Sequence, residues 1–66
     1  AGTLADALRA RGVPPDRATS VATLLIAAIE GAVILSRAKR TTRPLERVCG
    51  ELEAVVAREL ELAAAA

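Results

Sequence analysis

The sequence contains no histidine and a single cysteine, Cys49. Zinc therefore lacks a plausible set of ligands, and no disulfide can form within the chain. A chain of 66 residues buries only about 60% of its unfolded surface, so a disulfide, a metal or oligomerisation usually supports such a domain. With the first two excluded, association with another subunit, or packing inside a longer polypeptide, is what remains.

Phenylalanine, tryptophan, tyrosine and methionine are also missing. A core must therefore be built from Leu, Ile, Val and Ala, which suits close packing of helix on helix. Without aromatic rings the chain has no stacking platform for bases and no aromatic anchor for a ligand pocket. Its net charge of +1 is far from the basic excess of a free-standing nucleic-acid-binding domain.

Catalytic motifs are missing as well. The sequence shows no pair of carboxylates, no nucleophile with a base and no Gly-rich phosphate loop. We therefore expect neither an enzyme nor a cofactor or metal site. Cys49 has no histidine partner, and a cysteine on an apolar helix face is most simply a small hydrophobic residue.

What the chain does have is a long apolar run over residues 21–35, VATLLIAAIEGAVIL, with Glu30 as its one charge. A run of this length and composition predicts a helix that is buried on most of its circumference. We expect this helix to cover Pro15–Lys39, roughly 37 Å at 1.5 Å per residue. Gly31 at its centre costs about 1 kcal/mol against alanine, which indicates a close approach of another backbone.

Two further helices flank the long one. Residues 3–11 predict a short helix, with Thr3 and Asp6 as a capping box and Gly12 as its end. Two prolines then form a rigid elbow. Residues 44–62 predict an amphipathic helix whose apolar seam is interrupted by Glu59, and we expect residues 63–66 to fray. The fold class is therefore all-α with three helices: short, long and buried, and amphipathic.

A membrane span over residues 18–35 is the alternative reading. Eighteen residues with charges on both flanks lie near the lower limit for crossing a bilayer. Against it, Glu30 would cost several kcal/mol inside the bilayer without a partner, and no Trp or Tyr marks an interface. A helix-turn-helix around Gly12 is rejected, because the helix that would read DNA is long and apolar.

The polar positions of the long helix give two weaker signals. Thr23, Glu30 and Arg37 are seven residues apart and share one face, so Thr23 and Glu30 are candidate ligand contacts. For Glu30, an ion pair with an arginine of a neighbouring helix, or simple exposure to solvent, is the favoured explanation. Arg37, Lys39, Arg40 and Arg43 cluster at the end of the helix, where cations meet the negative end of the helix dipole; contact with a phosphate or a lipid headgroup is the alternative.

Two stretches carry a family resemblance. The first is the elbow RGVPPDRA. The second is AAIEGAVILSRAKRTTRPLERV, where a long apolar helix containing Glu-Gly leads through a basic turn to a helix that starts with Pro-Leu. In this order they resemble the C-terminal part of TetR-family transcriptional repressors, over about residues 4–58.

The resemblance implies a helical domain that binds a small-molecule effector and dimerises. It follows an N-terminal helix-turn-helix DNA-binding domain, which this chain lacks. The last two helices of each subunit would pair with those of its mate as a four-helix bundle. Residues 1–66 would then be the C-terminal dimerisation part of a cytoplasmic repressor that contacts DNA only through the missing domain and has no membrane partner.

The apolar faces independently predict a homodimer, because two such faces cannot both be covered within one short chain. A two-fold pairing would bury the same patch on both subunits, and each buried Leu, Ile or Val contributes roughly 1.5–3 kcal/mol. We expect the interface to use Val21, Leu25, Ala28, Ala32, Leu35, Leu45, Val48, Leu52, Val55 and Val56.

Overall fold

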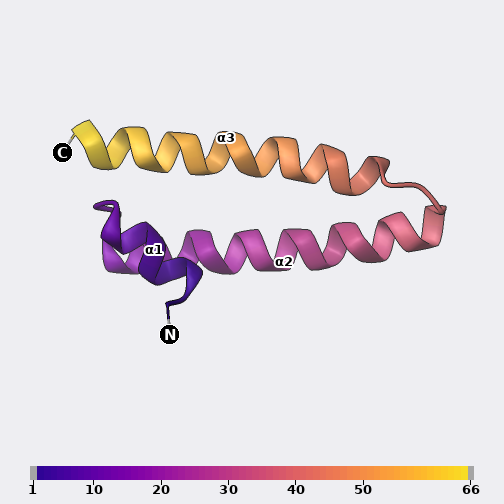
Figure 1. Ribbon diagram of the computed structural model, residues 1–66, viewed down its shortest axis with the longest axis horizontal. Helices are drawn as coiled ribbons and strands as arrows, with labels where there is room; N and C mark the ends of the chain where they lie inside the picture. The colour runs from indigo at the N-terminus through magenta and orange to yellow at the C-terminus, as the bar shows by residue number, and fades with distance from the viewer. Residues whose placement is uncertain (1, 66) are drawn as a thin grey trace.

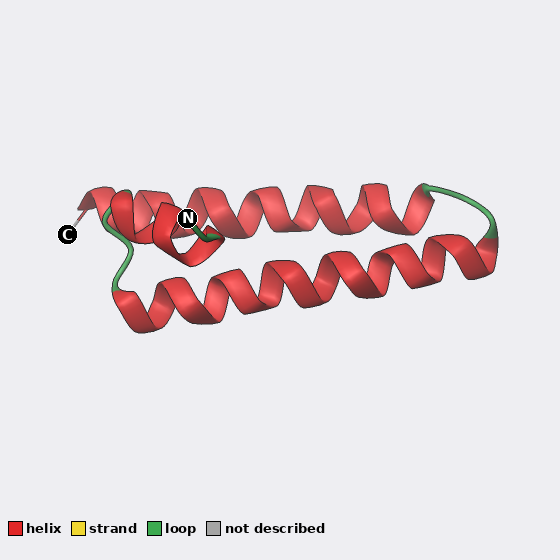
Figure 2. Cartoon of the chain, turned by 60° about the horizontal axis from the view of Figure 1, so that its bottom comes forward, coloured by secondary structure: helices red, strands yellow, loops and turns green. Residues whose placement is uncertain are grey.

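The computed structural model describes residues 2–65, which form three helices and, within that range, no strand. They are α1 (Leu4–Ala10), α2 (Pro15–Lys39) and α3 (Arg43–Ala65). α2 and α3 run antiparallel, side by side, as a helical hairpin, and α1 lies across the open end of the hairpin on one face (Figure 1; Figure 2). The three helices together measure 42 × 24 × 16 Å. The all-α fold with three helices is confirmed.

The ends of α1 follow the sequence signals. Thr3 accepts a hydrogen bond from the Asp6 backbone N–H at 3.1 Å, and the Asp6 carboxylate accepts one from the Thr3 backbone N–H at 3.1 Å, so the expected capping box is present. Gly12 has φ +94°, a conformation that glycine adopts without a steric penalty. The Val13 N–H then reaches back to the Leu8 carbonyl oxygen at 3.1 Å, which closes the helix as a Schellman motif.

α2 begins with a proline and ends, like α1, in a Schellman motif, but with arginine instead of glycine in the left-handed position. Pro15 occupies the first turn, where the missing N–H of proline has no intrahelical partner to lose. At the other end the left-handed position is taken by Arg40, with φ 54°. The Thr41 N–H donates to the Ser36 carbonyl oxygen at 3.0 Å, which again is the Schellman pattern.

The first turn of α3 has a partner for each of its backbone N–H groups. Thr41 Oγ1 accepts from Arg43, the Ser36 hydroxyl accepts from Leu45 at 3.2 Å, and the Thr42 carbonyl oxygen accepts from Glu46. Of the two hydroxyls that accept from this turn, that of Thr41 belongs to the loop and that of Ser36 belongs to α2. Because of the Ser36 bond, the end of α2 holds the start of α3 in place.

α3 continues to Ala65, so the frayed tail expected from residue 63 onward is wrong for residues 63–65. Ala63 is partly buried against the core, and its Cβ lies beside Gly12. This contact with the turn after α1 gives the last turn of the helix something to pack on. Ala66 lies outside the described residues.

The core lies at the open end of the hairpin, where α1 supplies a third wall. Its buried members are Leu8, Val13, Ala18, Val21, Ala22, Leu25 and Leu52. Nearer the turn, Ala32 is the one further buried hydrophobic residue in the described range. α2 is therefore buried along one side rather than on most of its circumference, because only one long helix and one short helix of the same chain pack on it.

Candidate functional site

A row of incompletely covered apolar residues follows both helices of the hairpin. We call it the back stripe: Leu24, Ala28, Gly31 and Leu35 on α2, and Val48, Val55 and Leu62 on α3. Spacings of three and four on α2, and of seven on α3, keep each set on one helix face. Leu24 is 48% exposed, Leu35 49% and Leu62 54%. Large apolar side chains left exposed in a row indicate a surface that another molecule covers.

The two halves of the stripe lie on the same side of the hairpin. Near the turn, Leu35 and Val48 line one shallow hollow together. At the open end, Arg17 on α2 bonds Glu59 on α3. Arg17 is seven residues before Leu24 and Glu59 is four residues after Val55, so this pair joins the two helices beside the stripe near the open end. No member of the stripe lines the groove on the opposite side of the hairpin.

Gly31 sits in the middle of the α2 half. A Cβ added there would meet nothing within 4 Å, so the chain itself gives no packing reason for a glycine in a helix interior. Glycine costs about 1 kcal/mol there compared with alanine. The missing side chain leaves open space on this face of α2, where another helix could approach closely.

The ten residues expected at a subunit interface are divided by the structure into three groups. Ala28, Leu35, Val48 and Val55 belong to the back stripe. A second group, Val21, Leu25, Ala32 and Leu52, is buried inside the chain, each residue being at most 9% exposed, and offers little area to a second subunit. Leu45 and Val56 line hollows away from the stripe. The period of the helices puts Ala28 and Leu35 on one seam with the buried residues of α2, whereas the structure divides that seam between the core and the back stripe.

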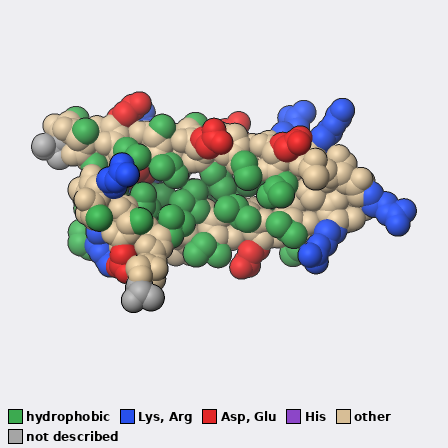
Figure 3. All heavy atoms as spheres, viewed as in Figure 1, with side chains coloured by type: hydrophobic (Ala, Val, Ile, Leu, Met, Phe, Trp, Pro, Cys, Tyr) green, Lys and Arg blue, Asp and Glu red, His purple; other side chains and the backbone are tan. Residues whose placement is uncertain are grey.

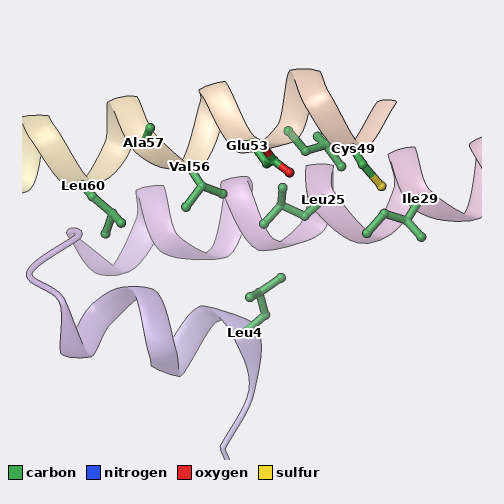
Figure 4. Close-up of a pocket in the computed structure, with 9 residues that line it drawn as sticks. Leu4, Leu25, Ile29, Cys49, Glu53, Val56, Ala57 and Leu60 are labelled. Atoms are coloured by element: carbon green, nitrogen blue, oxygen red, sulfur yellow. The ribbon is translucent and has the colours of Figure 1, made fainter. Parts of the chain in front are cut away.

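The opposite face carries an open apolar groove of about 600 Å³. Leu4 from α1, Leu25 and Ile29 from α2, and Cys49 and Leu60 from α3 point into it (Figure 4). Hydrophobic side chains also gather between α2 and α3 on this face in Figure 3. Glu53 is the one charged residue of its lining. Cys49 is exposed here rather than buried as a small hydrophobic residue.

Thr23 and Glu30, the candidate ligand contacts, lie outside this groove. Both are exposed on the outer side of α2. The Thr23 hydroxyl donates to the Thr19 carbonyl oxygen of its own helix at 2.8 Å. Among the ion pairs of the described residues none involves Glu30, so of the three explanations for this residue the structure supports exposure to solvent.

Glu59, which the sequence pattern indicates only as an interruption of the α3 seam, is a buried and paired residue in the structure. It is only 6% exposed, and both of its oxygens accept hydrogen bonds from Arg17, from Nε at 2.8 Å and from Nη2 at 2.9 Å. These bonds lower the pKa of Glu59, against the raising effect of burial, and the pKa of Arg17 is raised in turn. The bidentate pair joins the start of α2 to the end of α3.

No group of three or more Cys, Asp or Glu side chains that could hold a metal ion occurs within residues 2–65. One helix of this range, α2, is long and apolar enough to cross a membrane, and less than a third of its most apolar stretch is buried inside the chain. Both the back stripe and a membrane span would account for the exposed part.

Comparison with known proteins gives a consistent picture. A family model described as transcriptional regulator LmrA/YxaF-like, C-terminal domain, matches residues 1–51. The chain is 41% identical over 51 residues to an uncharacterized HTH-type transcriptional regulator of Mycobacterium tuberculosis, both in strain CDC 1551 / Oshkosh and in strain ATCC 25618 / H37Rv. The match covers 77% of this chain and 26% of each relative, so the chain spans about a quarter of their length. No solved structure matches it.

Proposed function

The chain belongs to the TetR family of transcriptional regulators, as a C-terminal domain of the LmrA/YxaF-like type, and from this premise we propose that it is the homodimerisation part of a ligand-responsive repressor. In this proposal α2 and α3 pair with the same helices of a second copy as a four-helix bundle. DNA is read by a helix-turn-helix domain elsewhere in a longer cytoplasmic protein.

The back stripe is the observation that carries the proposal. It runs along both long helices and exposes Leu24, Leu35 and Leu62 by about half each. A two-fold axis through one stripe covers the same residues in both copies. Gly31 at its centre allows the backbones of two α2 helices to approach closely, which would explain a glycine that has no use within the chain.

Sedimentation equilibrium of the chain in detergent-free buffer tests the pairing. We expect a single species of twice the 6.8 kDa chain mass. A monomer at high micromolar concentration would end the dimer proposal. Aggregation that only detergent relieves would favour the bilayer span over residues 18–35 instead.

Two glycine variants locate the contact. Gly31→Ala and Gly50→Ala both replace a helix-interior glycine whose added Cβ would meet nothing in the chain, so each gains about 1 kcal/mol of helix propensity. If the subunits meet at Gly31, Gly31→Ala should weaken the dimer about tenfold or more, since the methyl group enters the interface. Gly50→Ala, which lies off the stripe, should leave the dimer unchanged. Equal behaviour of the two variants would argue against a contact at Gly31.

A second pair of variants separates dimerisation from folding. Leu35→Asp changes an exposed stripe residue and should give a folded monomer, because the charge then lies at the subunit contact. Ile26→Asp changes an equally exposed residue of α2 outside the stripe and should stay dimeric. Leu52→Asp places a carboxylate in the core of the chain itself and is expected to unfold it, so it reports on folding rather than on pairing.

The groove on the face of α1 would form one wall of the effector site in the full-length protein. It is apolar apart from Glu53, which suits a largely apolar effector. Calorimetry on the full-length protein carrying Ile29→Asp should show weaker effector binding with operator binding intact. An unchanged effector affinity would show that the groove is not part of the effector site.

A further inference from the structure

The turn between α2 and α3 concentrates positive charge. Residues 37–47 hold five of the nine Lys and Arg residues and one of the eight acids. The remaining residues, with four cations and seven acids, are net negative. We call the five cations the basic tip: Arg37, Lys39, Arg40, Arg43 and Arg47. Figure 3 shows Lys and Arg side chains gathered at this end of the hairpin. The positive and negative charges therefore lie at different parts of the molecule, although they nearly cancel to a net charge of +1.

The salt bridges of the described residues leave these charges unused. All five residues are exposed. The ion pairs within residues 2–65 join Arg9 to Asp6 and Arg17 to Glu59, and neither involves the tip. The one acid of the turn, Glu46, accepts a hydrogen bond from the Thr42 hydroxyl instead.

Part of the tip is placed against the preferences of the helices. Arg37 and Lys39 suit the negative end of the α2 dipole, but Arg43 is the first residue of α3, at the positive end. α3 has no basic residue in its last turn, where a cation would stabilise it. Arg40 is held in a left-handed conformation that glycine adopts at lower cost. Charges kept at such positions indicate a role outside folding.

We infer that the basic tip binds the phosphate backbone of duplex DNA as a contact separate from any helix-turn-helix domain. Four of the five cations are arginines, whose guanidinium groups match phosphate oxygens. Threonine hydroxyls stand beside them in shallow hollows on both sides of the turn. The choice of DNA as the polyanion rests on the proposed function, in which the domain belongs to a protein that sits on an operator.

An extended polyanion fits the tip better than a single phosphate. The backbone N–H groups of the first turn of α3 are already bonded, so they cannot cradle one anion. The five cations instead lie spread over the turn and the adjoining ends of α2 and α3, and duplex DNA presents one negative charge per about 1.7 Å of axis. The chain also lacks asparagine, glutamine and aromatic residues, so we expect no base reading by amides and no stacking on single strands.

Fluorescence anisotropy with a labelled random duplex of about 20 base pairs tests the inference. The tip variant carries Arg37→Gln, Arg43→Gln and Arg47→Gln. Its control carries Arg9→Gln, Arg11→Gln and Arg58→Gln, which remove the same charge elsewhere. At about 0.1 M salt the tip variant should bind ten- to a hundredfold more weakly, and the slope of log affinity against log salt should fall by about 2 to 3. The control should bind within about twofold of the unchanged chain.

The outcomes separate clearly. Equal losses in both variants, or no duplex binding by the unchanged chain, would overturn the inference. So would tip-dependent binding to phosphatidylserine vesicles without binding to duplex, which would assign the tip to a membrane surface. Circular dichroism checks that both variants remain helical. If the triple tip variant does not, a double variant takes its place, with Lys39→Gln and Arg47→Gln. Its control then carries Arg11→Gln and Arg58→Gln. If the chain is a monomer and binds duplex through the tip, this inference holds and the proposed dimer is wrong. If the chain is a dimer and does not bind duplex, the proposed dimer holds and this inference is wrong.

Discussion

At Arg40 the backbone enters the left-handed region, with φ 54°, to close α2. This conformation costs a residue with a Cβ roughly 1–2 kcal/mol. Glycine avoids this cost, but its greater conformational freedom in the unfolded chain offsets part of the benefit. Arg40→Gly should therefore stabilise the fold by about 0.5–1 kcal/mol, measured as a raised midpoint in urea. Arg40→Ala removes the same charge but keeps the strain, so it should bring no such gain. A gain of equal size in both variants would attribute the effect to charge.

The Arg17–Glu59 pair makes stability depend on pH. Because the arginine lowers the pKa of Glu59 from its ordinary value of 4.5, the unfolded chain binds this proton more readily than the folded chain. The stabilisation is then fully present above the ordinary value and is lost as pH falls through the lowered pKa. Urea midpoints at neutral and acidic pH should show that Glu59→Gln destabilises the fold at neutral pH and reduces the loss on acidification.

Glu61→Gln is the matched control for the pair. Glu61 is exposed and two residues away from Glu59, so its substitution should leave the difference between neutral and acidic midpoints as it is. If both variants reduce that difference equally, general charge repulsion rather than the ion pair sets the pH dependence.

Residue types alone could not identify this pair. Glu59 breaks an apolar seam, a pattern that fits a tolerated surface charge as well as a buried one. Its partner is 42 residues away, and only the antiparallel arrangement of α2 and α3 brings the two together. Contacts that are local in sequence, such as the Thr3–Asp6 capping box, were predictable because the helix itself sets their distance.

Among the helices, one hydroxyl of α2 helps to cap the start of α3. Ser36 on α2 accepts the Leu45 N–H of α3 at 3.2 Å and is partly buried. Ser36→Ala should leave that N–H without its partner and cost about 1 kcal/mol, as the loss of a helix cap does. Thr42→Ala is the comparison, because its hydroxyl bonds only an exposed carboxylate; it should cost clearly less in the same urea titration. The reverse order would show that α3 is capped locally.

Helix boundaries were well predicted where a cap, a glycine or a proline marked them. α2 covers Pro15–Lys39 as expected, and the start of α3 differs by one residue. The end of α3 was predicted three residues too early, since an alanine run carries no stop signal and its packing against the turn after α1 is a tertiary contact. Ser36 was likewise invisible as a cap, because it belongs to a different helix from the one that it caps.

For the whole molecule, the sequence predicts how much apolar surface exists but not which copy covers it. The period of 3.6 residues defines the seams of α2 and α3, whereas the rotation of each helix about its axis decides which seam faces inward. That rotation depends on α1 and on the turn, and it placed Val21, Leu25 and Leu52 inside the chain. The residues left for a partner, Leu24 and Leu62 among them, became visible only in the folded hairpin.

A dimer makes thermal stability depend on concentration, since association stabilises only the folded form. For two 66-residue chains, a tenfold rise in concentration should raise the melting temperature by roughly 4–6 °C. Leu35→Asp, as a folded monomer, should melt at the same temperature at every concentration. Calorimetry over a hundredfold range would show it, and a constant melting temperature of the unchanged chain would contradict the dimer.

The basic tip has a consequence before any contact is made. A body 42 Å long with positive charge at one end and net negative charge over the rest carries a permanent electric moment. In the field of a polyanion such a molecule experiences a torque as well as an attraction, and field gradients act on it although its net charge is small. It would therefore rotate during diffusion and arrive with the α2–α3 turn first, while α1 and the open end of the hairpin trail away from the surface that it meets.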